Sequence, residues 1–220
     1  AGAACTATAV ETSLRIGSAP VRVAARLTSR DSVDSTVSVV RELIGAVDRR
    51  ATCVTHDSGN PRDQIVPFFE ALTPLGYLGW GKSTPLGSGL GLMMGAKLAK
   101  PDWLCINIMG DAAIGMVGLH IETAVRCEIP VLTVVLNNGL MGGYTYWQPI
   151  ATEKYRIQYL GGHYADLART LGAHGERVER IGDIQPAFAR AIRQTKEGKP
   201  ALLEIMTREE PILAVPQKHA

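Results

Sequence analysis

Short runs of β-branched and aliphatic residues alternate with longer segments of helical period between about residues 33 and 206. In the clearest unit, a strand pattern over 103–109 (WLCINIM) and another over 130–136 (PVLTVVL) flank a helical pattern over 116–128. This order predicts a βαβ unit, whose crossover is right-handed. Because such units repeat along the chain, we predict an α/β fold, an open parallel sheet with helices on both faces.

The same patterns divide the whole chain. Residues 33–207 carry the alternation and are predicted to form one domain. Residues 1–32 show neither period clearly, so we predict an irregular N-terminal arm or the remnant of a preceding domain, and residues 208–220 are a C-terminal tail. Further strands are predicted over 52–56, 177–181 and 201–206, and further helices over 33–47, 86–100, 163–173 and 184–197.

Composition excludes several classes of protein. The chain of 220 residues is 46% hydrophobic, enough for one sizeable core. Lys and Arg total 23 against 21 Asp and Glu, a balance that argues against binding to nucleic acid or to an anionic membrane. No run approaches the ~20 apolar residues that span a bilayer. The four cysteines lack CxxC spacing and lie mostly in apolar runs, which predicts reduced thiols in a cytoplasmic protein.

A lone carboxylate, Asp111, follows the strand at 103–109. One interpretation is that it caps the next helix. The other is that it belongs to a binding site, because Gly110 allows close approach and the amides of Ala112 and Ala113 open a helix, where an anion is favoured. Since a carboxylate would repel that anion, we predict a divalent cation between them.

The strand after Asp111 in the chain supplies further oxygen atoms. Asn137 and Asn138 stand at its end, and adjacent parallel strands bring their carboxyl ends together. An asparagine amide oxygen and a backbone carbonyl of the following loop could complete the protein's share of the coordination. An all-oxygen ligand set favours Mg²⁺ or Ca²⁺ over zinc.

The pair Gly110-Asp111 with Asn138 at the end of the next strand resembles the metal and diphosphate motif of thiamine diphosphate-dependent enzymes. That motif starts Gly-Asp-Gly and closes with Asn-Asn, and this chain departs from it at Ala112. The resemblance implies that Asp111, Asn138 and the Leu140 carbonyl bind Mg²⁺, which holds the cofactor's diphosphate. It also implies cofactor contacts at further positions, namely Gly110, Ala112, Ala113, Leu140 and Met141.

The resemblance extends over about residues 33–207, which look like the carboxyl-terminal, diphosphate-binding (PP-type) domain of acetolactate synthase-like enzymes. It rests on THDSGNPRD, GYLGWGKSTPLGSGLGLMMGAKLA and the closing KPALLEIMT. In that family a bulky apolar residue wedges between the two cofactor rings. Leu86 matches that position, and simple core packing is the alternative. His56 is a candidate to relay a proton or to contact a substrate carboxylate, and a loop histidine in ordinary hydrogen bonds is the alternative.

The family likeness implies a thiamine diphosphate-dependent lyase or transferase acting on a 2-keto acid, as a decarboxylase or carboligase. The glutamate that activates the cofactor belongs to a pyrimidine-binding domain, which nothing in residues 1–32 matches. We therefore expect a fragment, a truncated gene product or a subunit that pairs with such a domain in a homo- or hetero-oligomer. Alone it would bind cofactor weakly and catalyse nothing. A non-catalytic binding or assembly domain is the alternative.

Overall fold

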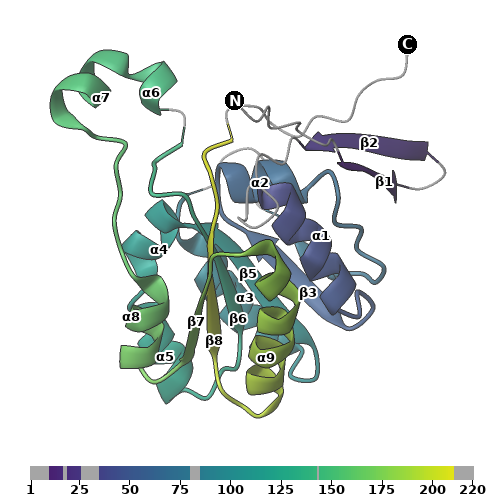
Figure 1. Cartoon of the computed structure of the whole chain (residues 1–220). Helices are drawn as coiled ribbons and strands as arrows, with labels where there is room; N and C mark the ends of the chain where they lie inside the picture. The colour runs from purple at the N-terminus through teal and green to yellow at the C-terminus, as the bar shows by residue number, and fades with distance from the viewer. Residues whose placement is uncertain (1–9, 17–18, 26–34, 80–84, 143, 211–220) are drawn as a thin grey trace, which may run out of the picture.

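The computed structural model describes residues 10–16, 19–25, 35–79, 85–142 and 144–210 (Figure 1). Its main sheet has six strands in the order β4-β3-β5-β6-β8-β7, and every neighbouring pair is parallel. This confirms the predicted fold class. The strands are β3 (Thr52–His56), β4 (Tyr77–Leu78), β5 (Leu104–Gly110), β6 (Leu132–Asn137), β7 (His174–Val178) and β8 (Ala201–Met206).

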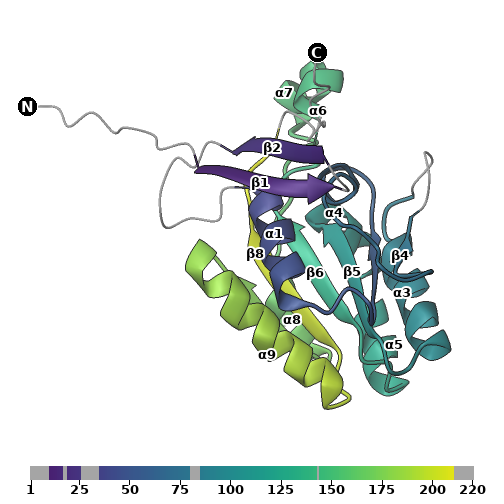
Figure 2. The same cartoon turned by 90° about the vertical axis from the view of Figure 1, so that its right-hand side faces the viewer.

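Helices cover both faces of this sheet, as Figures 1 and 2 show. One apolar core joins the sheet to α1 (Thr36–Ala46), α2 (Asn60–Ile65) and α9 (Ile184–Lys196). The second core joins the other face to α3 (Ser88–Ala99), α4 (Asp111–Val117), α5 (His120–Arg126) and α8 (Tyr164–Thr170). Within the described parts of the chain, no helix is both long enough and apolar enough to cross a membrane.

Local sequence signals account for the ends of these helices. The Ser35 hydroxyl accepts the Val37 amide at 3.1 Å and caps α1, as serine does at many helix starts. In α9 the buried residues recur at helical spacing, and Phe188 is fully buried. Gly198, with φ of +87°, and Pro200 follow α9, because glycine adopts the left-handed conformation that ends a helix.

The two faces of the sheet differ in polarity. Side chains alternate between faces along a strand. Ile106 and Ile108 belong to the core under α1 and α9, whereas Cys105 and Met109 belong to the core under α3 and α8. In β3, β5, β6 and β8, five buried polar residues share the α3 and α8 face by this alternation: Thr55, Asn107, Thr133, Asn137 and Glu204. On the other face the buried polar residues of these strands are Thr52 and His56, both in β3, so the polar row that crosses all four strands lies on the α3 and α8 face.

Four local predictions differ from the structure. The strand predicted over 177–181 lies at His174–Val178. The segment after β3 contains α2, which Pro61 opens at its first turn. The predicted helix 116–128 begins at Asp111 and is divided into α4 and α5. Part of the predicted irregular arm is a hairpin, in which β1 (Val10–Ile16) pairs antiparallel with β2 (Ala19–Ala25).

The hairpin has a visible cause in the sequence, because polar and apolar residues alternate in VETSLRI, the period of a strand. Its two strands form a sheet of their own. Residues 1–9, 17–18 and 26–32 of the predicted arm, and residues 211–220 of the predicted tail, lie outside the described residues.

Two short helices, α6 (Tyr144–Trp147) and α7 (Pro149–Tyr155), project from the body beyond the carboxyl end of β6 (Figure 1). The base of this projection is closed by backbone hydrogen bonds. Leu160 donates to the Gly139 carbonyl at 2.8 Å, and Met141 donates to the Gln158 carbonyl at 2.7 Å. The loop that follows β6 is therefore tied to the chain that returns from α7.

Replacing Phe188 by Ala should destabilise the protein by about 3–5 kcal/mol, because it removes a fully buried ring where α9 packs on the sheet. Chemical denaturation followed by circular dichroism measures the change. Lys196→Ala at the exposed end of the same helix is the control, with an expected change within about 0.5 kcal/mol. Equal stability of the Phe188 variant and the wild type would contradict this packing.

Candidate functional site

The loops that follow β5 and β6 meet at one edge of the sheet. Gly110 and Leu136 are partners in the register of these two adjacent parallel strands. Asp111 follows β5 directly as the first residue of α4, and it is 3% exposed. Its Oδ2 accepts the Gly139 amide at 2.7 Å and the Leu140 amide at 3.2 Å. The carboxylate therefore joins the two loops directly.

Asn138 lies in the same arrangement. Its Oδ1 accepts the Leu140 amide at 2.9 Å, so oxygen atoms of Asp111 and Asn138 converge on one N–H. Gly139 between them has φ of +71°, a left-handed conformation that glycine adopts without strain. Two side-chain oxygens that lie this close to the same N–H are suited to a cation that binds oxygen ligands.

Among the described residues, no basic side chain forms an ion pair with Asp111. Burial raises the pKa of the Asp111 carboxyl, and the backbone amides of Ala112, Gly139, Leu140 and Asn138 partly oppose that rise. A bound divalent cation would supply the missing positive charge, so the residues present fit such an ion.

The surroundings of Gly110 are open. A Cβ built on Gly110 meets no atom within 4 Å, and its φ of −87° is available to any residue. Glycine is therefore not required here by the backbone, and the space beside it can admit a ligand. The amides of Ala112 and Ala113 lie in the first turn of α4, where N–H groups favour an anion, and the Ala112 amide donates to the Asp111 Oδ1 at 2.9 Å. This edge fits an anionic group next to a cation.

Leu86 and Met141 lie at the margins of the site. Leu86 is half-buried just before α3 and packs against the core under that helix. This contact agrees with the packing alternative and leaves its contact with a cofactor a prediction. Met141 is half-buried, and its amide donates to the Gln158 carbonyl at 2.7 Å.

His56 belongs to the other face of the sheet. Its ring is 2% exposed and stacks on Tyr77, with ring centroids 5.6 Å apart. Its Nδ1 lies 3.1 Å from the Asp57 carbonyl oxygen, and burial lowers the pKa of the imidazole. Among the described residues, no hydrogen bond or ion pair joins His56 to Asp111, and a role of His56 in the site stays a prediction.

Asp57 follows His56 directly at the end of β3. It is fully buried, and its Oδ1 accepts the Gly87 amide at 2.7 Å. Its Oδ2 and the Asn107 Oδ1 are buried without a hydrogen-bond partner in the described structure. Both atoms face Gly89, where a Cβ would lie 2.9 Å from the Asp57 oxygen and 2.3 Å from the Asn107 oxygen. The backbone at the start of α3 therefore packs directly against the Asp57 and Asn107 side chains.

A second buried acid, Glu204, lies in β8. It is fully buried, and its Oε1 accepts the Asn137 side-chain amide at 2.7 Å. The signal in the sequence was a lone acid inside the apolar run ALLEIM. A buried acid usually has hydrogen-bond partners, so this pattern indicates a buried polar network but not which residues belong to it.

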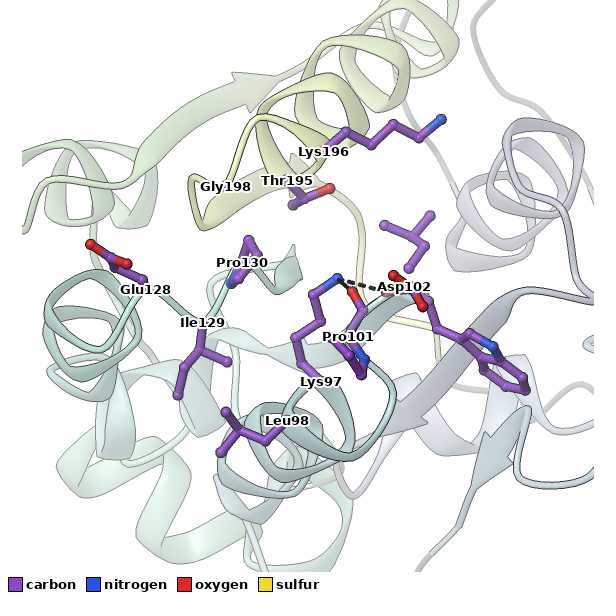
Figure 3. A pocket seen from close by; sticks show the side chains of 12 residues that line it. Lys97, Leu98, Pro101, Asp102, Glu128, Ile129, Pro130, Thr195, Lys196 and Gly198 are labelled. Carbon is purple, nitrogen blue, oxygen red and sulfur yellow. Dashed lines mark hydrogen bonds between the residues drawn. The ribbon is translucent and has the colours of Figure 1, made fainter.

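Figure 3 shows a pocket of about 460 Å³ at the opposite edge of the sheet, where β5 begins. Lys97 lies in it and donates to the carbonyls of Pro101 and Trp103, at 2.7 and 2.8 Å. Ligands of open parallel sheets bind outside the carboxyl ends of the strands. This pocket lies at the amino ends and is separate from the site of Asp111.

Comparison with known proteins agrees with the resemblance in the sequence. Residues 57–205 match the family described as thiamine pyrophosphate enzyme, C-terminal TPP binding domain. Over 191 residues, 82% of this chain, it is 30% identical to a probable acetolactate synthase of Mycobacterium bovis, covering 32% of that protein. It is 34% identical over 178 residues (78% of the chain) to a sulfoacetaldehyde acetyltransferase of Alcaligenes xylosoxydans xylosoxydans, covering 29% of it.

A 2-hydroxyacyl-CoA lyase of Oryza sativa subsp. japonica is 27% identical over 180 residues, 76% of this chain and 30% of that protein. The chain thus spans about a third of the length of the curated relatives it matches. These relatives are named for different reactions, so the similarity identifies a shared domain and not one substrate.

Asp57→Asn should change how stability depends on pH. Burial raises the pKa of Asp57 from 3.8 to about 6, so the folded protein favours its neutral form. That contribution to stability is fully present below pH 3.8 and is lost as the pH rises through about 6. At ~1.4 kcal/mol per pKa unit, the unfolding free energy of the wild type should fall by about 3 kcal/mol relative to the variant between pH 4 and 7.

Urea denaturation of both proteins across this pH range measures the difference. Asp102→Asn, an exposed acid at the opposite edge of the sheet, is the control and should follow the wild type. A constant difference between wild type and Asp57→Asn would contradict a neutral Asp57.

Proposed function

Because this chain belongs to the thiamine pyrophosphate enzymes and contains their C-terminal TPP-binding domain, we propose that it binds the diphosphate of thiamine diphosphate (TPP) through Mg²⁺. The observation that carries the proposal is the convergence of Asp111 and Asn138 oxygens on the Leu140 amide. A buried carboxylate without a side-chain cation supports a metal ion at this point.

Each residue of the site has a distinct role in this proposal. Asp111, Asn138 and the Leu140 carbonyl hold Mg²⁺, which prefers oxygen ligands. The backbone of Gly110 and of Ala112 and Ala113 in the first turn of α4 contacts the diphosphate, together with one residue of the loop after β6, Met141. Leu86 supports the cofactor rings. His56 stays a candidate for contact with substrate from the other face of the sheet.

When bound, the cofactor would supply the nucleophilic carbon and the electron-accepting ring that cleavage of a C–C bond next to a carbonyl requires. The chain's own residues bind and orient it. We propose a 2-keto acid as the substrate of a decarboxylase or carboligase, since relatives include an acetolactate synthase and a lyase. We further propose that turnover requires a pyrimidine-binding domain or subunit in an oligomer, because the family's activating glutamate belongs to that domain.

Asp111→Ala should abolish cooperative binding of TPP and Mg²⁺, because it removes the only charged group among the proposed ligands. Calorimetric titration of the full chain with both compounds measures this, with an expected loss of affinity of at least 10-fold. Asp102→Ala, which removes an exposed acid far from the site, is the control and should bind as the wild type does. Equal binding by the Asp111 variant would overturn the metal assignment.

Gly110→Ala tests the proposed diphosphate contact independently of the proposed metal site. The φ of −87° accepts alanine, so the fold and the binding of Mn²⁺ alone should stay close to those of the wild type. The added methyl group enters the open space beside α4, so affinity for TPP should fall about 10-fold or more, which corresponds to ~1.4 kcal/mol. Unchanged TPP affinity would place the diphosphate elsewhere.

A further inference from the structure

Glu204 lies in the middle of β8, between β6 and β7, and is fully buried. Its Oε1 accepts the Asn137 Nδ2 at 2.7 Å and the Arg177 Nη1 at 3.1 Å, and its Oε2 accepts the Ala165 amide at 3.0 Å at the start of α8. All three partners donate, so the group accepts as a carboxylate. Apolar residues in place of such a buried ion pair are often neutral or stabilising, so stability alone gives little reason for it.

The carboxylate of Glu204 decides the orientation of one amide. The Asn137 side chain donates its Nδ2 to Glu204, which leaves its Oδ1 to accept the Gly139 amide at 3.1 Å. The reversed amide would set two acceptors against each other at Glu204 and two donors against each other at Gly139. Asn137 therefore presents an acceptor to the loop after β6 because Glu204 holds it in that orientation.

Gly139 connects this network to the site. Its N–H is shared between the Asn137 Oδ1 and the Asp111 Oδ2, and it lies between Asn138 and Leu140 in the chain. If Asp111 turns to a cation, Gly139 still has an acceptor in Asn137. The hydrogen bond from Gly139 to Asn137 therefore holds the loop that carries Asn138 and Leu140 without the help of Asp111.

We infer that Glu204 is a positioning residue for the cation site, acting through Asn137 on the Gly139 amide and so on Asn138 and the Leu140 carbonyl. The inference rests on the proposed function, since it concerns the same Mg²⁺ site. Residues that orient metal ligands from behind commonly change metal affinity by about 10- to 100-fold when they are replaced. Glu204 orients the loop after β6 in this way, although it is not itself a proposed metal ligand.

The test is the affinity of the full chain for Mn²⁺ alone, a probe for Mg²⁺ whose free ion is counted by electron paramagnetic resonance. Glu204→Gln keeps the shape but has one oxygen and one NH₂ group, so it cannot accept from both Asn137 and Ala165. We expect Mn²⁺ to bind about 10- to 100-fold more weakly, with an unchanged circular dichroism spectrum. Arg177→Gln removes the ion-pair partner of Glu204 but leaves the hydrogen bonds from Asn137 and Ala165 in place, so it is the control and should alter affinity less than about threefold.

Asn137→Ala and the double variant distinguish positioning from a general structural role. If Glu204 acts through Asn137, Glu204→Gln should weaken Mn²⁺ binding by less than about threefold in the Asn137→Ala background. Independent, multiplying effects would overturn the inference. Should Glu204→Gln fail to fold, Glu204→Leu with Arg177→Met removes both charges of the ion pair, and the same loss of Mn²⁺ affinity is expected of it.

The two proposals fail in different ways. Wild-type chain that binds no Mn²⁺ would overturn the proposed function and this inference with it. Wild-type chain that binds Mn²⁺, together with a folded Glu204→Gln variant of equal affinity, would overturn the inference alone.

Discussion

The hydrogen bonds from the Gly139 and Leu140 amides to the Asp111 carboxylate join the loops of two strands, and the geometry of the whole site depends on them. They are possible because β5 and β6 are neighbours and parallel, so that both loops leave the sheet at the same edge. The cost of burying Asp111 appears as a raised pKa. Under the proposed function, this arrangement of oxygen atoms around a buried acid is in place before the cation binds.

The two faces of the sheet carry different kinds of buried side chains. The face under α1 and α9 is packed with aliphatic and aromatic side chains around Phe188. The face under α3 and α8 carries the polar row, in which Asn137 and Glu204 hydrogen-bond to each other across strands. Buried polar groups must find partners, so a row of them constrains the loops above it in a way that an apolar face does not.

Much of the fold follows from local patterns. The β3 and β8 strands lie where TCVTH and ALLEIM predict them, and the fold class and family are confirmed. The α2 helix was missed because it is only six residues long and opens with turn-forming residues. The strand predicted over 177–181 lies at His174–Val178 because its pairing with β8, from His174 opposite Ala201, selected its ends. The roles of the individual site residues stay predictions.

The sequence by itself determined the alternation of strands and helices, the edge of the sheet at which Gly110 and Asp111 stand, and the domain family, because each of these depends on residues close together in the chain. Only the tertiary structure decided the partners of the buried polar groups. Asn137 meets Glu204 across 67 positions of sequence, and Gly139 meets Asp111 across 28. Periodicity reports which face of an element is buried, but strand order and register choose which polar atoms meet there.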